Sequence, residues 1–299
     1  MPGEFLSTVL TRWRVSAAEP DPPLESRSGA GVYRVRTAGG QEAYLKVTPS
    51  TLDARAVPAT WRELRFYREI APTAPVRTPR LLDAVAEEAG VALLLEAVGE
   101  TRPVGMWTTG QWAELGQALA RLHEMPVPAG AGWDRPDPLR EAMAEPDVEA
   151  LRAFWAPSLP QLSELLARKD TVWEQLSAGS SVFVHGDCHT ENILVASEDL
   201  VFCDWQVTGL GRASTDLAFV SVRAVPHGVT APSVFLDAYL AARSGDPGSL
   251  RRAVLAEELA IFVFLWPPYA VYNDERAVTR VRERTRRLAE RWLAASTSG

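Results

Sequence analysis

The sequence predicts an α+β chain with a small β-rich first lobe and a larger, mainly helical second lobe. Short apolar runs of strand length, separated by glycine-rich turns, occupy much of residues 24–98. Beyond them, apolar residues recur with the spacing of helices that cover a core on one face. Residues 181–220 interrupt this pattern with short apolar runs that end in polar residues. We therefore expect two lobes, at residues 1–98 and 99–299.

Composition and charge limit the class of protein. A chain of 299 residues, 46% of them hydrophobic, can bury the cores of two lobes. The net charge of −7 argues against nonspecific binding to nucleic acid or to anionic membranes, and is compatible with a cationic small partner. Two cysteines are too few for a disulfide framework, and no signal-peptide pattern is visible. The longest apolar run, at 259–266, is too short to span a bilayer. We expect a soluble, cytoplasmic protein.

A short helix and a linker precede the first sheet. Apolar side chains recur at helical spacing at Phe5, Val9 and Trp13, which predicts an amphipathic helix within residues 1–15. The proline-rich stretch at 19–23 breaks this pattern, as a linker does. We therefore expect the sheet of the first lobe to begin after this break.

Residues 24–47 predict a small sheet that contains a glycine-rich turn. Ser28 and Gly29 begin a Ser-Gly-Ala-Gly sequence whose backbone N–H groups are able to cradle a phosphate. Such clusters are also generic turn signals, and an ordinary hairpin is the more frequent meaning of the pattern. Both interpretations stay open at this point.

Lys46 is the residue of the first lobe that most clearly suggests a function. It lies in the otherwise apolar strand 43–47, where a lysine is most often an edge residue or one that extends its head to solvent. A functional buried lysine needs an acidic partner. The helix predicted at 59–70 offers Glu63 and Glu69, and either of them is equally compatible with a solvated helix charge.

A continuous apolar strand at 91–95 closes the first lobe, and a capped helix opens the second. Thr108 and Gln111 have the spacing of a capping box, and the apolar residues that follow form one core-facing stripe. We expect His123, at the end of this helix, to be satisfied by the carbonyl groups of the last turn.

Acidic residues crowd the segment 134–149, where prolines interrupt the pattern. They are Asp134, Asp137, Glu141, Glu145, Asp147 and Glu149. Charge runs of this kind usually form a solvated face without a specific ligand. The sharper alternative is a patch that attracts a polyamine-like acceptor.

Residues 181–220 place polar side chains at the ends of short strands. A buried strand ends near Asp187, Asn192 follows in the next turn, and a later strand ends at Asp204. Side chains at strand ends on a rigid scaffold are a usual place for chemistry. Two carboxylates and a carboxamide suit one base and two oxygen ligands for a hard cation such as Mg²⁺.

Three chemical interpretations compete for this stretch. His185, Cys188, His189 and Cys203 are potential zinc ligands, but their spacing matches no common zinc pattern. A structural role as caps of turns and helices accounts for single residues but not for the set. Phosphoryl transfer requires an aligned hydroxyl, a neutralised triphosphate and a base, and it gives every polar residue of the set a role.

Four motifs follow one another in this stretch: HGD-x-x-x-x-N at 185–192, FCDW at 202–205, Gly209-x-Gly211, and DLA at 216–218. In this order they resemble the aminoglycoside phosphotransferase and choline-kinase-like branch of the protein-kinase fold. The YLKV strand and the WRELRFY helix extend the likeness, which covers roughly residues 24–220. The resemblance implies a two-lobed protein-kinase-like fold, with a nucleotide-binding N-terminal lobe and a catalytic, acceptor-binding C-terminal lobe.

The resemblance also implies roles for individual positions. Asp187 is implied as the catalytic base, Asn192 and Asp204 as ligands of Mg²⁺, and Lys46 as the phosphate-holding lysine paired with Glu63.

Further contacts with the nucleotide are implied for four residues, which are Ser28, Gly29, Glu96 and Val98. The last two would bind the base through their backbone groups. Two other residues are implied to support the catalytic loop, His185 and Asp216.

The function implied is that of an ATP-dependent O-phosphotransferase that acts on a hydroxyl of a small molecule, with an aminoglycoside-type antibiotic as the expected acceptor. Other members of the family phosphorylate choline, homoserine, sugars or macrolides, and these remain alternatives. A rival of another class is a nucleotide-binding pseudokinase scaffold. It is disfavoured because every residue of the phosphoryl-transfer template is present.

Overall fold

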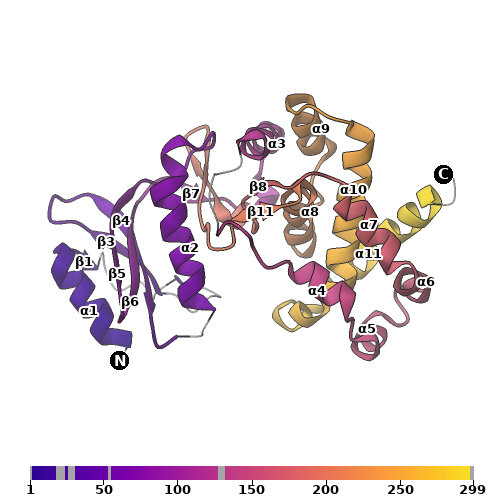
Figure 1. The fold of residues 1–299 in the computed structure, drawn as a ribbon, viewed down its shortest axis with the longest axis horizontal. Coiled ribbons are helices and arrows are strands. Elements are labelled where there is room, and N and C mark those ends of the chain that lie inside the picture. Colours follow the sequence, from indigo (N-terminus) through magenta and orange to yellow (C-terminus); the bar gives the residue numbers. More distant parts are fainter. Residues whose placement is uncertain (1, 18–23, 26–30, 53–54, 127–131, 297–299) are drawn as a thin grey trace. The chain divides into compact units, whose positions relative to one another are not determined.

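The structure is a computed structural model that describes residues 2–17, 24–25, 31–52, 55–126 and 132–296. The chain divides into two compact units, residues 1–100 with 194–208 and residues 101–193 with 209–299. The first unit contains a small antiparallel sheet and the second is mainly helical, which confirms the predicted α+β class (Figure 1). The predicted linker at 19–23 lies outside the described residues.

The sheet of the first unit has the strand order β1-β3-β4-β6-β5, and β2 pairs with β3. Every pairing is antiparallel. The strands are β1 (Ser16–Ala17), β2 (Leu24–Glu25), β3 (Gly31–Arg36), β4 (Glu42–Pro49), β5 (Leu81–Glu87) and β6 (Gly90–Glu96). Strand β4 therefore lies between two neighbours and is not an edge strand.

Helices α1 (Pro2–Trp13) and α2 (Ala56–Glu69) lie on opposite sides of this sheet (Figure 1). Successive residues of a strand point to opposite faces, so β4 divides its side chains between the two helices. Leu45 joins the apolar cluster that also contains Phe5 of α1. Thr48, of the other parity, shares a 2.8 Å hydrogen bond with Thr60 of α2. The same parity directs Lys46 toward α2.

A second, smaller sheet has the order β10-β9-β7. Its strands are β7 (Glu100–Thr101), β9 (Ile193–Ala196) and β10 (Asp199–Phe202). The amide of Phe202 donates to the carbonyl oxygen of Arg77 at 2.8 Å, which ties the end of β10 to the segment before β5. This end of β10 carries Asp204.

Helices form most of the second unit. They are α3 (Thr109–Glu124), α4 (Pro138–Ala144), α5 (Val148–Trp155), α6 (Leu162–Ala167), α7 (Lys169–Ser177), α8 (Ala213–Ala224), α9 (Ser233–Ala242), α10 (Pro247–Ala260) and α11 (Glu275–Ser296). The predicted capping box of Thr108 and Gln111 is present at the start of α3. Helices α3 and α9 lie side by side (Figure 1), and a Cβ at Gly116 would stand 2.2 Å from the carbonyl oxygen of Phe235. Only glycine permits this approach.

The acidic segment contains two helices that the sequence pattern did not predict. Asp137 accepts a hydrogen bond from the amide of Arg140 and begins α4. Asp147 accepts one from the amide of Ala150 and begins α5. Two carboxylates of the cluster therefore serve as N-caps, the position that aspartate favours at a helix start.

The apolar run at 259–266 does not keep α-helical geometry to its end. Helix α10 continues as a π-helical turn, η5 (Ile261–Leu265), and then as a 3₁₀ segment, η6 (Pro267–Tyr272). Prolines 267 and 268 cannot continue an α-helix because they have no N–H donor. Across the part of the chain that the structure describes, no helix is long and apolar enough to cross a membrane.

Candidate phosphotransfer site

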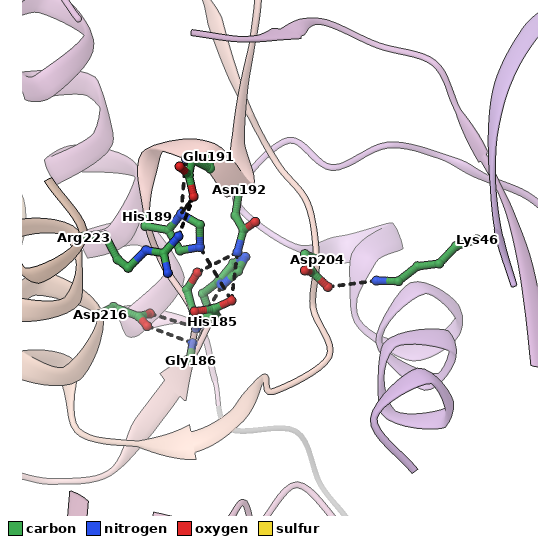
Figure 2. Close-up of polar contacts among 10 residues, drawn as sticks. Lys46, His185, Gly186, His189, Glu191, Asn192, Asp204, Asp216 and Arg223 are labelled. Carbon is green, nitrogen blue, oxygen red and sulfur yellow. Dashed lines mark hydrogen bonds and ion pairs between the residues drawn. The ribbon is translucent and has the colours of Figure 1, made fainter. Parts of the chain in front are cut away.

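Lys46 is a buried residue of the first unit, held by two carboxylates. Its Nζ lies 2.7 Å from Oε2 of Glu63 and 2.8 Å from Oδ1 of Asp204, the second contact being drawn in Figure 2. Glu69, the other acidic residue of the helix, has an exposed side chain and forms an ion pair with Arg65 instead. The interpretation of Lys46 as an edge residue is therefore wrong, because β4 is a central strand and the lysine side chain is only 8% exposed.

The charge of Lys46 is fixed by this surrounding. Burial disfavours the ammonium ion, but the carboxylates of Asp204 and Glu63 outweigh burial and raise the pKa of Lys46 above its usual value. Lys46 is therefore a cation at neutral pH and presents a positive charge beside Asp204.

Asp204 adopts a backbone conformation that is rare for a residue with a side chain. Its φ of +63° lies in the left-handed region, and such conformations cluster at functional sites where the surroundings hold them in place. The next residue, Trp205, stacks on Phe66 of α2 with ring centroids 3.8 Å apart. Its indole N–H donates to the carbonyl oxygen of Phe202. These contacts anchor the turn that directs Asp204 toward Lys46.

The predicted nucleotide-base contacts lie at the end of β6. The carboxylate of Glu96 accepts from the backbone amide and the guanidinium of Arg80, at 3.2–3.3 Å, and its own amide donates to the carbonyl of Arg80. Val98, two residues later, is half-buried. The side chain of Glu96 thus fixes the end of the strand. Binding of the nucleotide base by the backbone of Glu96 and Val98 stays a prediction. Ser28 and Gly29 lie outside the described residues.

In the second unit, strand β8 (Val182–Val184) leads into the His185-Gly186-Asp187 turn (Figure 2). Gly186 has a φ of +86°, which a residue with a Cβ rarely adopts. The amides of His185 and Gly186 both donate to the carboxylate of Asp216 at 2.8 Å. The amide of Asp187 donates to Nδ1 of His185 at 3.3 Å. The turn is therefore fixed through its backbone.

Asp216, on α8, is fully buried and depends on a histidine that sequence reasoning misassigned. Nε2 of His123 lies 3.1 Å from Asp216, and Nδ1 lies 2.8 Å from the hydroxyl of Tyr239. The expectation that carbonyl groups of α3 satisfy His123 was wrong. Burial raises the pKa of Asp216, but the hydrogen bond and charge of His123 outweigh it and keep the pKa below its usual value. The signal in the sequence was a histidine beside the apolar stripe of α3, where it requires a buried polar partner.

Asn192 stabilises the loop that carries Asp187. Its Nδ2 donates to the carbonyl oxygen of Asp187 at 2.9 Å and to Oδ2 of the same residue at 3.1 Å. Burial disfavours the charged form of Asp187, yet the contact and charge of His189, with His185 and Arg223, lower its pKa to about 2. Asp187 is therefore a carboxylate at neutral pH.

Two residues carry oxygen atoms of the kind that bind a hard cation. Asn192, in the second unit, has an amide oxygen, and Asp204, in the first unit, has a carboxylate whose Oδ1 contacts Lys46. Oxygen donors of these two types are the ligands that Mg²⁺ takes. The zinc interpretation has no support, because within the described residues no three His, Cys, Asp or Glu side chains gather to hold a metal ion.

An ion-pair network around Arg212 was not predicted. The guanidinium donates to both oxygens of Glu257, at 3.0 and 2.7 Å, and to the carboxylate of Asp137. Glu257 is fully buried and also accepts from the hydroxyls of Ser214 and Thr215. The network therefore joins the start of α8 to α10 and α4. Asp137, a member of the acidic cluster, has a structural partner.

Comparison with known proteins shows the family and the fold of the chain. A model of the phosphotransferase enzyme family matches residues 22–253, more than half of the chain. No curated protein matches. Three solved structures are similar to this chain, and the match covers nearly all of each of them. They are a choline/ethanolamine kinase family protein from Mesorhizobium loti, amicoumacin kinase hAmiN in complex with AMP-PNP, Ca²⁺ and Ami, and the aminoglycoside phosphotransferase APH(3'')-Id from Streptomyces rimosus in complex with ADP and streptomycin.

The likeness to these structures is one of fold. The first is 21% identical, with a TM-score of 0.66 and full coverage of both chains. The second is 15% identical, with a TM-score of 0.61 and coverage of 97% of this chain and 96% of the other. The third is 22% identical, with a TM-score of 0.54 and coverage of 86% and 98%. The predicted protein-kinase-like fold is confirmed. The chain belongs to the phosphotransferase enzyme family.

Proposed function

We propose that the protein is an ATP-dependent O-phosphotransferase that transfers the γ-phosphoryl group of Mg-ATP to a hydroxyl of a small molecule. The observation that carries this proposal is the buried Lys46 between Glu63 and Asp204. A desolvated cation with two carboxylates is an expensive arrangement for a protein core, and hydrophobic residues of similar volume would serve stability as well or better. Its retention is explained by a need for a fixed positive charge at the phosphates.

Each residue then has a defined task. Lys46 holds the phosphates, and Glu63 holds Lys46. Asn192 and Asp204 are the oxygen ligands that would hold Mg²⁺, which when bound offsets charge on the phosphates. Asp187 accepts a hydrogen bond from the acceptor hydroxyl and aligns it. As the new P–O bond forms and the bond to ADP breaks, the hydroxyl proton passes to Asp187.

We propose that the base of the nucleotide binds at the end of β6. The carbonyl oxygen of Glu96 and the backbone of Val98 supply one acceptor and one donor there, and Arg80 keeps Glu96 in place. Ser28 and Gly29 are proposed to contact the phosphates through their backbone N–H groups. His185 and Asp216 support the loop that carries Asp187.

For the acceptor we propose a polycationic amino sugar of the aminoglycoside type. The support is the net charge of −7 and the exposed carboxylates of Glu141, Glu145 and Glu149. Asp137 and Asp147 are engaged as helix caps, so the part of the cluster available to a ligand is smaller than its six members. One similar structure contains streptomycin, an acceptor of this type.

The test is an ADP-release assay with Mg-ATP over a panel of aminoglycosides, macrolides, choline, homoserine and simple sugars. Asp187→Asn serves as the blank, and mass spectrometry identifies the phosphorylated product. Turnover with an aminoglycoside supports the proposal in full, and turnover with another acceptor replaces the acceptor class only. Tight Mg-ATP binding without turnover on any acceptor would favour the pseudokinase.

A further inference from the structure

His189 lies in the loop of Asp187, and the mechanism above gives it no task. The residue is 5% exposed and its ring has a different neighbour on each nitrogen. Nδ1 accepts a hydrogen bond from the backbone amide of Glu191 at 3.3 Å, which caps the short turn η3 (Thr190–Asn192). Nε2 lies 3.7 Å from Oδ2 of Asp187. The ring therefore bridges the turn and the carboxylate of Asp187.

The contact at Nδ1 determines where the ring carries its proton. A neutral imidazole has one N–H donor and one acceptor nitrogen. Since an amide N–H points at Nδ1, this nitrogen is the acceptor, and the proton is on Nε2. The N–H of His189 is thus directed at the carboxylate of Asp187. The separation of 3.7 Å is longer than an ordinary hydrogen bond, as contacts of catalytic groups often are before the substrate is bound.

The two oxygens of Asp187 are consequently not equivalent. Nδ2 of Asn192 lies 3.1 Å from Oδ2, the same oxygen that faces Nε2 of His189. Both donors converge on one oxygen and restrict rotation of the carboxylate. Oδ1 receives neither of them.

Helix α8 holds the ring of His189 in this orientation. Arg223 of α8 binds the carboxylate of Glu191, the residue whose backbone amide donates to Nδ1 of His189. The ring of Phe219 lies 6.1 Å from that of His189. The orientation of His189 therefore depends on contacts from its own turn and from α8.

We propose that His189 is a positioning residue for phosphoryl transfer, which with Asn192 holds Oδ2 of Asp187 so that Oδ1 receives the acceptor hydroxyl. This assignment rests on the proposed function. It predicts that kcat depends on the hydrogen-bond donor at the position of Nε2. The acceptor at the position of Nδ1 instead stabilises the turn η3.

Two substitutions separate these tasks. His189→Gln places an amide N–H near the position of Nε2 and loses the acceptor at Nδ1, while His189→Asn retains the acceptor and loses the donor. We expect His189→Asn to lower kcat by about 10–100-fold, the effect of losing a hydrogen bond to a charged group, with KM for ATP unchanged. His189→Gln should lose at most about threefold, and thermal unfolding of both variants reports on the turn. The reverse order, or equal losses in both variants, would show that His189 is only a loop cap and would overturn the proposal.

A measurement without substrate keeps this test separate from the proposed function. ¹⁵N NMR of the histidine ring nitrogens reports the tautomer, and the chain has only four histidines to assign. We expect a proton on Nε2 of His189 and a change in its ¹⁵N shift in Asp187→Asn. A proton on Nδ1 would overturn the proposal even in an active enzyme. If wild-type protein phosphorylates no acceptor, the proposed function fails while the tautomer still decides the geometry.

Discussion

Replacing Arg212 by Met should destabilise the second unit strongly. Glu257 is fully buried, and Arg212 supplies two of the four hydrogen bonds that its carboxylate accepts. Removing one partner of a buried pair leaves an uncompensated charge, which costs about 3–5 kcal/mol. Methionine keeps an apolar stem of similar length but removes the guanidinium, whose carbon lies 4.9 Å from the centroid of the Trp173 ring, so the loss is mainly electrostatic. For a unit of this size the midpoint of thermal unfolding should fall by about 6–20 °C.

The assay is thermal and urea unfolding followed by circular dichroism, with two comparison variants. Arg251→Met breaks the exposed pair with Asp237 and should cost less than about 1 kcal/mol. Adding Glu257→Gln to Arg212→Met removes the unpaired charge, and the glutamine oxygen still accepts from one of the hydroxyls of Ser214 and Thr215 while its NH₂ donates to the other. This should restore at least about 1 kcal/mol. An effect of Arg212→Met no larger than that of Arg251→Met would refute the reasoning.

Three further predictions concern single side chains. Lys46→Met should raise KM for ATP by at least about tenfold, the value of one lost charged hydrogen bond, whereas Glu69→Gln should not; equal effects in enzyme kinetics would contradict the assignment. The pKa of Asp216 is lowered in the folded protein, so the contribution of its carboxylate to stability is present above its ordinary pKa and is lost as the pH falls below that value. The stability of Asp216→Asn in acid unfolding should therefore depend less steeply on pH below about 4 than that of the wild-type protein. An unchanged slope would count against the buried pair of Asp216 with histidine. Gly116→Ala should lower the free energy of unfolding in urea by about 1–3 kcal/mol or more, because a Cβ there would stand 2.2 Å from a backbone carbonyl oxygen of the facing helix. Gly105→Ala, which has open space around it, is the control. An equal loss in both variants would disprove the packing argument.

The residues closest to the proposed chemistry could be found from the sequence because they occur in short, ordered motifs. Local rules required an acidic partner for a lysine in a buried strand, and the next helix offered Glu63 and Glu69. They did not decide between the two, and only the resemblance to the family implied Glu63. The structure shows Lys46 bound to Glu63.

The contacts that support the site could not be predicted, because they join residues far apart in the chain. Arg212 binds Glu257, 45 residues later, and His123 binds Asp216, 93 residues later. No local spacing links such pairs, and each residue alone is compatible with a solvated or capping role. The acidic segment shows the same limit: its charges concealed the helix starts at Asp137 and Asp147, which are marked only by one aspartate each.

The most direct test of the central claim compares wild-type protein with Asp187→Asn for phosphoryl transfer from Mg-ATP to the best acceptor of the panel. The account predicts that wild-type protein forms ADP and phosphorylated acceptor in equal amounts. Asp187→Asn should bind Mg-ATP with similar affinity in calorimetry and lose at least about 100-fold in kcat, the lower range for removal of a positioned base. Turnover by Asp187→Asn at the wild-type rate would contradict the account.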